Sequence, residues 1–456
     1  MAEKLVYIET YGCQMNERDS ERMLGLLEME GYKHTDDPAR AHLILLNTCS
    51  VRAHAEDKVY TRLGRLRSLK EKRNGNLILG VVGCVAQQEG EKLLKRVRYL
   101  DLVLGTAQIA RLPQLVEAVE RRKTPMVSID LPRKLGDVNQ CFCEEDYPRP
   151  KVEGQVSAFV TVMEGCDKFC TFCIVPYTRG RERSRPAQHI LKEVRGLVSQ
   201  GVKEVTLLGQ NVNAYGKNSP EGIDLADLLH LLDGMDGLKR LRFTTSHPKE
   251  LNDKLIDCFG SVKKLCNHLH LPVQSGSNRI LNLMHRGYTR EEYLVKVERL
   301  RRVRPDIALA TDIIVGFPGE KEEDFHQTLS LMEEVQYDGS FSFIYSPRPG
   351  TRAAEWKDDV PTGLKRERLM QLQALQREMT IKKNRALEGK VMEVLVEGRS
   401  RKDPRELCGR TSCNRVVNFP GPPELMGKMV MVRIREGLPN SLRGELSGPS
   451  GPKKEV

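Results

Sequence analysis

Residues 164–173 read EGCDKFCTFC and place Cys166, Cys170 and Cys173 in one short loop. The loop directly follows an apolar, β-rich run at 158–163, so the cysteines lie at the carboxyl end of an expected strand. Thiolates bind iron strongly, and gaps of three and then two residues let one loop wrap three corners of a cubane. A zinc knob would normally offer a fourth ligand and paired two-residue gaps. The segment therefore predicts an iron–sulfur cluster in which one iron keeps an open coordination site.

The loop opens a stretch, about 155–378, in which strands and helices alternate six times. Each of the first five strands precedes a plausible helix, such as those expected over 187–200 and 290–303. Six β–α units predict a partial (β/α)6 barrel rather than full eight-fold closure. The six strands are expected at 158–163, 204–208, 240–244, 268–272, 308–315 and 341–345.

Upstream of this barrel, residues 1–145 predict a separate α/β domain. Continuous apolar strands are expected within 5–8, 42–46 and 77–82, separated by helical segments. Asn16 is expected to cap a helix over 17–30. Strands of this kind are typical of a parallel sheet with both faces covered. The segment 134–154 is rich in Pro, Asp and Glu, lacks periodicity and is expected to be a linker.

Three more cysteines, Cys13, Cys49 and Cys84, follow the expected strands of this first domain, one after each strand. The carboxyl ends of parallel strands meet at one edge of a sheet, where ligands bind. Three cysteines at equivalent strand ends therefore predict a second site with three thiolates. The alternative is three buried free thiols, because Cys is often a core residue.

Downstream of the barrel, residues 383–448 predict a small β-barrel. Short strands are expected at 390–397, 406–411, 416–419 and 428–435, with Gly and Pro between them. Residues 382–455 hold 16 Lys and Arg against nine Asp and Glu, which is +7 of the whole chain's +11. A basic barrel at a chain end predicts contact with a nucleic acid backbone, and a solvated basic surface is the alternative.

Composition limits the remaining possibilities. A chain of 456 residues predicts two or three domains. Residues 1–5 lead straight into a strand, and no apolar run reaches the roughly 20 residues that span a bilayer, so we expect a cytoplasmic protein without a membrane segment. Twelve cysteines in a reducing compartment are not expected to form a disulfide framework.

The C-x3-C-x2-C loop resembles the signature of the radical S-adenosylmethionine (SAM) superfamily. The resemblance implies that the open iron of a [4Fe-4S] cluster chelates SAM, which an electron then cleaves to a 5′-deoxyadenosyl radical. It implies that Phe172 packs near the adenine and that Gly209 and Gln210 meet the methionine amino group. This chain has no Gly-Gly-Glu at the latter segment. Gln274 and Ser275, which end the fourth barrel strand, are expected to contact SAM or the base, with loop capping as the alternative.

Further motifs are similar to those of the radical SAM methylthiotransferase family. The match covers nearly the whole chain, and the terminal barrel resembles the TRAM RNA-binding domain. Gln14, Met15 and Asn16, with Gln87 and Gln88, favour the branch that modifies N6-isopentenyl-adenosine beside the anticodon. The motifs are YGCQMN at 11–16, NTCSVR at 47–52, GCVAQQ at 83–88, residues 159–179, HLPVQSGS at 270–277 and residues 342–351.

The family resemblance implies a mechanism. One SAM methylates a sulfur on a [4Fe-4S] cluster held by Cys13, Cys49 and Cys84, and a second SAM yields the radical that removes hydrogen from C2 of the adenine. No catalytic side chain beyond the cluster ligands is expected, since the chemistry belongs to the cofactors. The implied partners are the anticodon loop of tRNA, a low-potential electron donor and a system that supplies sulfur or clusters.

Two other interpretations stay open. In the first, the chain is a sibling methylthiotransferase that acts on threonylcarbamoyl-adenosine or on a ribosomal-protein aspartate. In the second, it is a non-catalytic RNA-binding protein with structural metal. Arg179, Arg181, Arg183 and Arg185 form a basic run expected to meet RNA phosphate or to be a solvated face. No role is assigned to Cys141, Cys143, Cys408 or Cys413, and Cys258 and Cys266 are expected to be ordinary small apolar residues.

Overall fold

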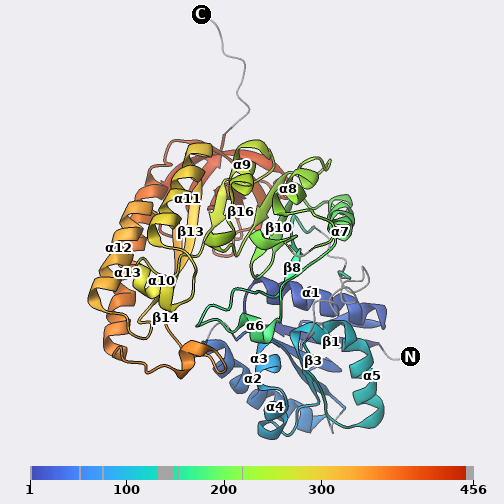
Figure 1. Ribbon diagram of the computed structural model, residues 1–456. Helices are drawn as coiled ribbons and strands as arrows, with labels where there is room; N and C mark the ends of the chain where they lie inside the picture. The colour runs from blue at the N-terminus through green and yellow to red at the C-terminus, as the bar shows by residue number, and fades with distance from the viewer. Residues whose placement is uncertain are drawn as a thin grey trace, which may run out of the picture.

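The computed structural model describes residues 3–50, 53–73, 76–131, 148–150, 154–217 and 219–447. Most of the expected linker at 134–154, with Cys141 and Cys143, lies outside these ranges. Figure 1 shows an N-terminal α/β domain beside the lower end of a larger barrel-like unit, with the C-terminal strands behind its upper part. Among the described residues, no helix has the length and apolarity needed to cross a membrane.

The N-terminal domain is built on a parallel sheet of six strands, in the order β2-β1-β3-β4-β5-β6. The three predicted strands are its central β1, β3 and β4, so the parallel sheet is confirmed. Three further strands of three residues each complete it. The strands are β1 (Lys4–Thr10), β2 (Tyr32–His34), β3 (Leu43–Thr48), β4 (Ile78–Gly83), β5 (Leu102–Leu104) and β6 (Met126–Ser128).

Helices cover both faces of this sheet. Met23 of α1 and Leu115 of α5 pack on one face, whereas Leu63 of α2 and Leu93 of α4 pack on the other. Both strand faces are therefore apolar, as expected of buried parallel strands. The helices are α1 (Gln14–Met29), α2 (Ala53–Lys72), α3 (Cys84–Glu89), α4 (Glu91–Arg96) and α5 (Leu112–Arg122), with the 3-10 helix η1 (Thr106–Arg111).

The central domain contains all six predicted strands. They form two parallel sheets, β7-β10-β11 and β12-β13-β14, which the parallel bridge between Leu241 and Leu265 links into one curved wall. A short antiparallel pair, β8 with β9, was not predicted. The strands are β7 (Ser157–Thr161), β8 (Met163–Glu164), β9 (Arg183–Ser184), β10 (Glu204–Leu208), β11 (Arg240–Phe243), β12 (His268–His270), β13 (Ala308–Val315) and β14 (Gly339–Ile344).

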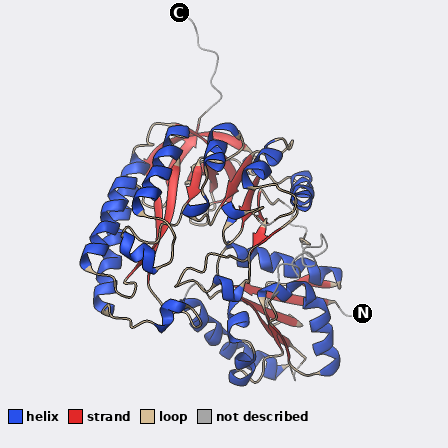
Figure 2. Ribbon diagram, viewed as in Figure 1, coloured by secondary structure: helices blue, strands red, loops and turns tan. Residues whose placement is uncertain are grey.

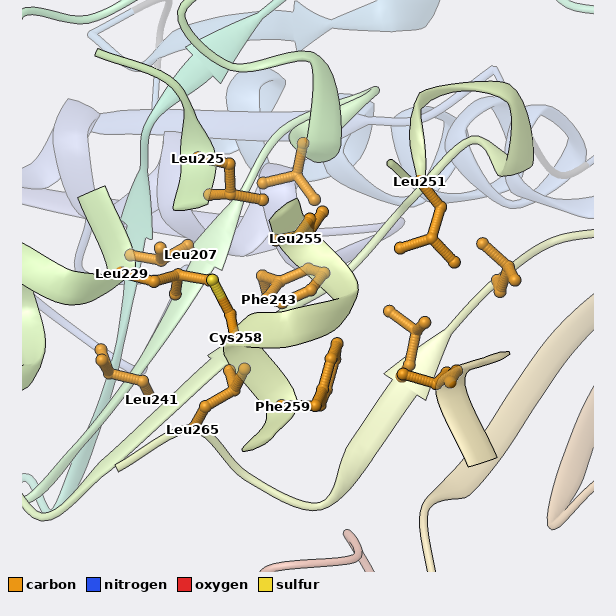
Figure 3. Packing of buried hydrophobic residues seen from close by; sticks show 14 of the residues in the cluster. Leu207, Leu225, Leu229, Leu241, Phe243, Leu251, Leu255, Cys258, Phe259 and Leu265 are labelled. Atoms are coloured by element: carbon orange, nitrogen blue, oxygen red, sulfur yellow. The ribbon is translucent and has the colours of Figure 1, made fainter. Parts of the chain in front are cut away.

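Helices cover the outer side of these strands (Figure 2). Leu207, Leu241 and Phe243 pack there against α8 and α9, and Cys258 lies among them as a small apolar residue, as expected (Figure 3). The helices are α6 (Val175–Thr178), α7 (Ala187–Ser199), η4 (Val212–Ala214), α8 (Leu225–Asp233), η5 (Pro248–Glu250), α9 (Asp253–Ser261), α10 (Asn278–Leu283), α11 (Arg290–Val303), α12 (Glu322–Val335), η6 (Arg352–Glu355) and α13 (Thr362–Arg385).

The C-terminal domain is a closed barrel in the order β15-β16-β17-β19-β18. Four of its strands were predicted, and β19 is the fifth strand that closes it. Its interior is apolar, with Val394, Phe419 and Ile434 fully buried. The strands are β15 (Val391–Arg399), β16 (Glu406–Thr411), β17 (Val416–Pro420), β18 (Met429–Gly437) and β19 (Leu442–Leu446), with η7 (Pro423–Leu425) between β17 and β18.

This barrel is attached at the amino ends of the central strands. Arg242 donates to the carbonyl oxygens of Thr411 (2.7 Å) and Ser412 (2.9 Å), and its Nε donates to Glu204 at 2.8 Å. Arg240, two residues earlier and on the same face of β11, donates to the Arg410 carbonyl at 2.6 Å. The carboxyl ends of the strands, where barrels of this type place their chemistry, therefore lie toward the N-terminal domain.

Candidate active site at two cysteine trios

The first trio lies at the carboxyl ends of three neighbouring strands. Cys49 directly follows β3, the middle strand, while Cys13 and Cys84 follow β1 and β4 on either side of it. The Cys49 thiol interacts with both of the others through hydrogen bonds. Cys49 and Cys84 are buried and Cys13 is exposed. The predicted convergence of these three cysteines is confirmed.

Two asparagines and a threonine fix these strand ends to one another. The fully buried Asn16 donates from Nδ2 to Asn47 Oδ1 and to the Thr48 carbonyl, both at 3.1 Å. Asn47 returns a bond to the Asn16 carbonyl at 2.7 Å, and the Thr48 hydroxyl donates to the Val82 carbonyl at 2.7 Å. Because each bond crosses between strands or from strand to helix, the cysteine spacing is locked by buried polar contacts.

The start of α1 differs from the prediction. The helix begins at Gln14 with Cys13 as its N-cap, so Asn16 is not the cap but the third helical residue. Its side chain pairs with the cap residue, and the Cys13 thiol donates to Asn16 Oδ1 at 3.2 Å. A cysteine is not among the favoured cap residues, which is why the composition of this segment pointed to Asn16 instead.

Glycines before two of the cysteines allow the backbone to approach closely. Gly83 has φ +94°, and a Cβ there would lie 2.5 Å from the Thr48 carbonyl oxygen. A Cβ on Gly12 would lie 2.6 Å from the Cβ of Cys49. Only glycine fits such positions, so these residues let the three strand ends crowd together around the thiols.

A buried cation serves the first trio, and it comes from the central domain. Arg179 lies between α6 and β9 and donates to Asp19 of α1 at 2.6 Å, with 5% and 4% of the two side chains exposed. A hydrogen bond from Cys49, helped by the Arg179 guanidinium, lowers the pKa of Cys13 to about 6 and that of Cys84 to about 7. Both thiols are therefore shifted toward the thiolate form that binds iron.

The second trio lies on the loop between β8 and α6. The Cys173 amide donates to the Cys170 carbonyl at 2.9 Å, and the Cys166 amide donates to Gly180 at 3.2 Å. Gly165 has φ +78°, and a Cβ there would lie 2.1 Å from the Arg181 carbonyl oxygen, so the loop folds tightly onto the following segment. Burial raises the pKa of Cys166 and of Cys173 to about 12, which a bound cation would offset.

Arg286 provides positive charge beside this second trio. Its Nη1 donates to Cys170 Sγ at 3.4 Å and its Nη2 donates to the Pro272 carbonyl at 2.7 Å, with the residue 5% exposed. Arg286 could not be predicted from the sequence, because it lies 116 positions from Cys170 and no local spacing connects the two. The charge of Arg179 toward the first trio was missed for the same reason.

Of the residues predicted to bind SAM, Phe172 lies in this loop and Gln210 contacts the residue before Cys166. Phe172 meets Phe317 edge to face, with ring centroids 6.4 Å apart, and Gln210 accepts a bond from the Gly165 amide at 2.5 Å next to Gly209. Gln274 has φ +74°, and Ser275 accepts from the Ser277 amide at 3.2 Å. Loop capping by Ser275 is thus observed, and contact of these residues with SAM stays a prediction.

The basic run that follows the loop was interpreted wrongly. Arg183 donates to Glu164 at 2.7 Å and Arg185 to Glu193 at 2.7 Å, and both arginines are as buried as Arg179. Only Arg181, 49% exposed and paired with Asp167, lies at the surface within this run. Three of the four arginines form ion pairs inside the protein, so they are neither a solvated face nor available to RNA phosphate.

The donor sets fit iron–sulfur clusters. Each trio offers three thiols next to a buried guanidinium, and glycines make room for the chain to wrap them. Within the described ranges, no three His, Cys, Asp or Glu side chains surround the position of a single metal ion. In an iron–sulfur cluster each cysteine binds its own iron.

Three family models match successive parts of the chain. Residues 5–105 match the uncharacterized protein family UPF0004, residues 160–332 the radical SAM superfamily, and residues 385–447 the TRAM domain. The three matches coincide with the N-terminal sheet, the partial barrel and the closed C-terminal barrel. The first trio lies in the first match and the second trio in the second.

Solved structures support the fold. The radical SAM methyltransferase TsrM from Kitasatospora setae, with cobalamin and a [4Fe-4S] cluster bound, aligns over 77% of each chain with a TM-score of 0.57 and 15% identity. The cobalamin-dependent SAM radical enzyme OxsB aligns over 82% of this chain and 56% of its own, with a TM-score of 0.54 and 13% identity. At such identities the likeness shows the fold alone.

Curated relatives are much more similar. A tRNA-2-methylthio-N(6)-dimethylallyladenosine synthase from Geobacter metallireducens is 54% identical over 98% of this chain and 99% of its own. Proteins of the same name from Burkholderia lata and Syntrophotalea carbinolica are 52% and 49% identical, each over 97% of this chain. With both cysteine trios in place and all three domains matched, the chain belongs to the tRNA-2-methylthio-N(6)-dimethylallyladenosine synthase family of radical SAM enzymes.

Proposed function

We propose that this enzyme adds a methylthio group to C2 of N6-dimethylallyladenosine beside the anticodon of tRNA, using two SAM molecules and two [4Fe-4S] clusters. The observation that carries the proposal is the pairing of the two cysteine trios. Arg179, six residues after the last cysteine of the second trio, reaches into the first trio and is held there by Asp19. The name shared by the relatives supports the same reaction.

Each trio has a defined role in this proposal. Cys166, Cys170 and Cys173 would hold a cluster with one open iron for SAM, and Cys13, Cys49 and Cys84 would hold the second cluster. When bound, these groups supply the electron that cleaves SAM and the sulfur that is inserted. Radical chemistry suits an aromatic C–H bond, because no side-chain base can remove such a weakly acidic hydrogen.

The protein's own task is to bind, orient and exclude water. Cys49 is 1% exposed, Cys166 9% and Cys170 7%, and Cys84 is also buried, whereas Cys173 is half-buried and Cys13 is exposed. Arg286 and Arg179 each hold positive charge beside one trio, which stabilises the anionic thiolates. Burial of four of the six cysteines limits the contact of a reactive radical with solvent.

The C-terminal barrel would hold the tRNA. Residues 391–446 of this barrel hold ten Lys and Arg against seven Asp and Glu, and Arg240 and Arg242 attach the barrel to the core. Phosphate contacts supply affinity and orientation, whereas an unpaired loop base supplies specificity. A low-potential electron donor and a source of sulfur or clusters complete the cycle. Reduced thiols and a tRNA substrate both favour the cytoplasm.

The test is mass spectrometry of tRNA nucleosides from cells with and without this gene. We expect 2-methylthio-N6-dimethylallyladenosine to disappear and its unthiolated precursor to accumulate. In a strain that lacks the prenyl modification, the enzyme should give no methylthio product. A product on threonylcarbamoyl-adenosine, or on a ribosomal-protein aspartate, would favour a sibling activity instead. Zinc in place of iron and sulfide after anaerobic reconstitution would indicate a non-catalytic RNA-binding protein.

A further inference from the structure

Four successive strands of the central domain place one side chain each on the same patch of the sheet. The His270 ring lies between Thr244 and Asp312, with Nδ1 3.4 Å from the Thr244 hydroxyl and Nε2 3.1 Å from Asp312 Oδ1. Phe341 meets the His270 ring edge to face, with centroids 6.1 Å apart. Thr244 directly follows β11, and His270, Asp312 and Phe341 lie in β12, β13 and β14, so they form one continuous surface.

This surface lies on the side of the sheet away from the helices. The residues that alternate with it, such as Leu269, Leu309 and Ile313, are fully buried in the core beneath the helices. Side chains along a strand alternate between the two faces, so the opposite set points into the concave side of the partial barrel. On β14 that set includes Phe341 and Phe343, since Ile344 packs against the helix-side core.

Phe341 and Phe343 are unusually open for aromatic residues in this location. Their exposed fractions are 56% and 40%, whereas the other large apolar side chains in the described strands of the partial barrel are buried or half-buried. Exposed apolar side chains that line a concave face typically mark a binding site. We call these two side chains the β14 wall.

The β14 wall runs toward the cysteine loop. Phe343 is paired across the sheet with Ile314, and Ile314 packs on the cluster of apolar residues that includes Phe172 and Phe317. Phe172 precedes Cys173 directly in the sequence. The wall is therefore continuous with the surroundings of the second trio, where the reaction is proposed to occur.

We propose that the β14 wall binds the apolar dimethylallyl group and the base of the prenylated adenosine. This inference rests on the proposed function and assigns the residues that recognise its substrate. An unstacked RNA base is commonly bound by aromatic faces, and a five-carbon apolar substituent gains most from burial against further apolar surface. Phe341 and Phe343, two residues apart on one face of β14, supply both the aromatic surface for the base and the apolar surface for the substituent.

The charge beside the wall disfavours the sibling substrate. Asp312 is paired across the sheet with Phe341, and 28% of its side chain is exposed. A threonylcarbamoyl substituent carries a carboxylate, which would be placed next to the Asp312 carboxylate and against apolar rings. Repulsion and unpaired desolvation of this kind are how sites reject a wrong partner. The dimethylallyl group carries no charge and meets neither obstacle.

The experiment compares the affinity of the cluster-loaded enzyme for two anticodon stem-loop RNAs. One RNA carries N6-dimethylallyladenosine, and the other carries unmodified adenosine at the same position. Binding is measured anaerobically with SAM but without reductant, so no turnover occurs. The wild type should prefer the prenylated RNA. Phe341→Ala and Phe343→Ala should each reduce that preference roughly five- to twenty-fold, with the affinity for the plain RNA retained. Phe341→Leu should keep part of it.

The matched control is Leu231→Ala, since Leu231 is 47% exposed on α8 at the outer side of the barrel and should leave the preference unchanged. Iron content and SAM cleavage report that each variant is folded and loaded. The proposal is overturned if the wild type shows no preference, if both alanine variants keep it, or if they weaken both RNAs equally. Nucleoside mass spectrometry with the wild type tests the proposed function separately, because a methylthio product can form whichever residues bind the prenyl group.

Discussion

Arg179 and Asp19 form a buried ion pair at 2.6 Å that joins the central domain to the N-terminal domain. The arginine follows the loop of the second cysteine trio, and the aspartate lies on the helix that starts at Cys13 of the first. The attraction of this pair holds the two candidate cluster sites in one orientation. The ion pair between Arg18 of α1 and Glu193 of α7 crosses the same interface, and Arg185 of the central domain also pairs with Glu193.

Replacing Arg179 with Gln should destabilise this interface strongly. The change leaves the Asp19 carboxylate buried without its cation, which typically costs about 3–5 kcal/mol. It also removes the positive charge beside Cys13 and Cys84, so iron retention at the first trio should fall. Thermal unfolding and iron analysis after reconstitution would measure both effects. The control Arg181→Gln changes an exposed pair and should stay within about 1 kcal/mol of the wild type.

The two trios should fail in different ways when their cysteines are removed. Cys166→Ala should abolish SAM cleavage, because a three-cysteine site cannot hold its cluster after losing one ligand. The triple alanine variant of Cys13, Cys49 and Cys84 should keep reductive SAM cleavage, lose about half of the iron and sulfide and form no methylthio product. Cys408→Ala serves as the control and should retain full iron. SAM cleavage by a folded Cys166→Ala protein would refute the assignment of the second trio.

Removing the charge of Arg286 should make the cluster on the second trio harder to reduce. Reduction adds negative charge, which the guanidinium 3.4 Å from Cys170 Sγ stabilises. We expect Arg286→Met to shift the midpoint potential to more negative values and Arg286→Lys to restore much of it. Redox titration followed by electron paramagnetic resonance measures the shift. Equal potentials in the methionine and lysine variants would mean that the charge has no such role.

The pH dependence of stability should show the contribution of the Glu193 ion pairs. Burial alone raises the pKa of this carboxyl, but Arg185, Arg18 and Arg149 outweigh it and hold the pKa at about 2. Because the folded pKa lies below the unfolded one, the stabilisation is present above about pH 4.3 and is lost as the pH falls toward 2. Glu193→Gln should therefore lower the free energy of unfolding by about 3 kcal/mol at neutral pH. Denaturant titrations should show this difference shrinking below pH 4, and a constant difference would contradict the ion-pair account.

Neutralising the exposed Arg401 and Lys402 of the C-terminal barrel with Gln should weaken tRNA binding and make it less sensitive to salt. If both side chains contact phosphates, the slope of log affinity against log salt should fall by about 2. The matched control changes Arg302 and Arg304, which lie at the carboxyl end of α11, and should leave the slope unchanged. SAM cleavage without RNA should be the same in both variants.

Much of the fold could be predicted because the apolar pattern of a long strand is visible in its own local sequence. The strands at Glu204–Leu208 and Ala308–Val315 and the helix at Arg290–Val303 have the predicted bounds. The strands β2, β5 and β6 were missed, since three residues are too few for a periodic pattern. They are strands because neighbours in the sheet provide their hydrogen bonds, which no local sequence reveals.

The cysteine trios could be predicted, but the charges around them could not. Strand ends and loop spacing place Cys13, Cys49, Cys84 and the Cys166 loop. By contrast, the role of each arginine depends on an acid or a thiol far away in sequence. Arg179 lies 160 positions from Asp19, and Arg286 lies 116 positions from Cys170. Whether an arginine is buried in an ion pair or exposed at the surface is therefore decided by tertiary contacts.

The order β1-β3-β4 has a consequence for how the enzyme matures. Cys166, Cys170 and Cys173 are neighbours on one loop, so even a largely unfolded chain can gather them at a small entropic penalty. Cys13, Cys49 and Cys84 come together only once three strands have paired in register, and their site is completed by an arginine from another domain. The first trio should therefore be loaded last, as an insertion into a folded protein, and a cell short of iron would accumulate molecules that cleave SAM but cannot insert sulfur.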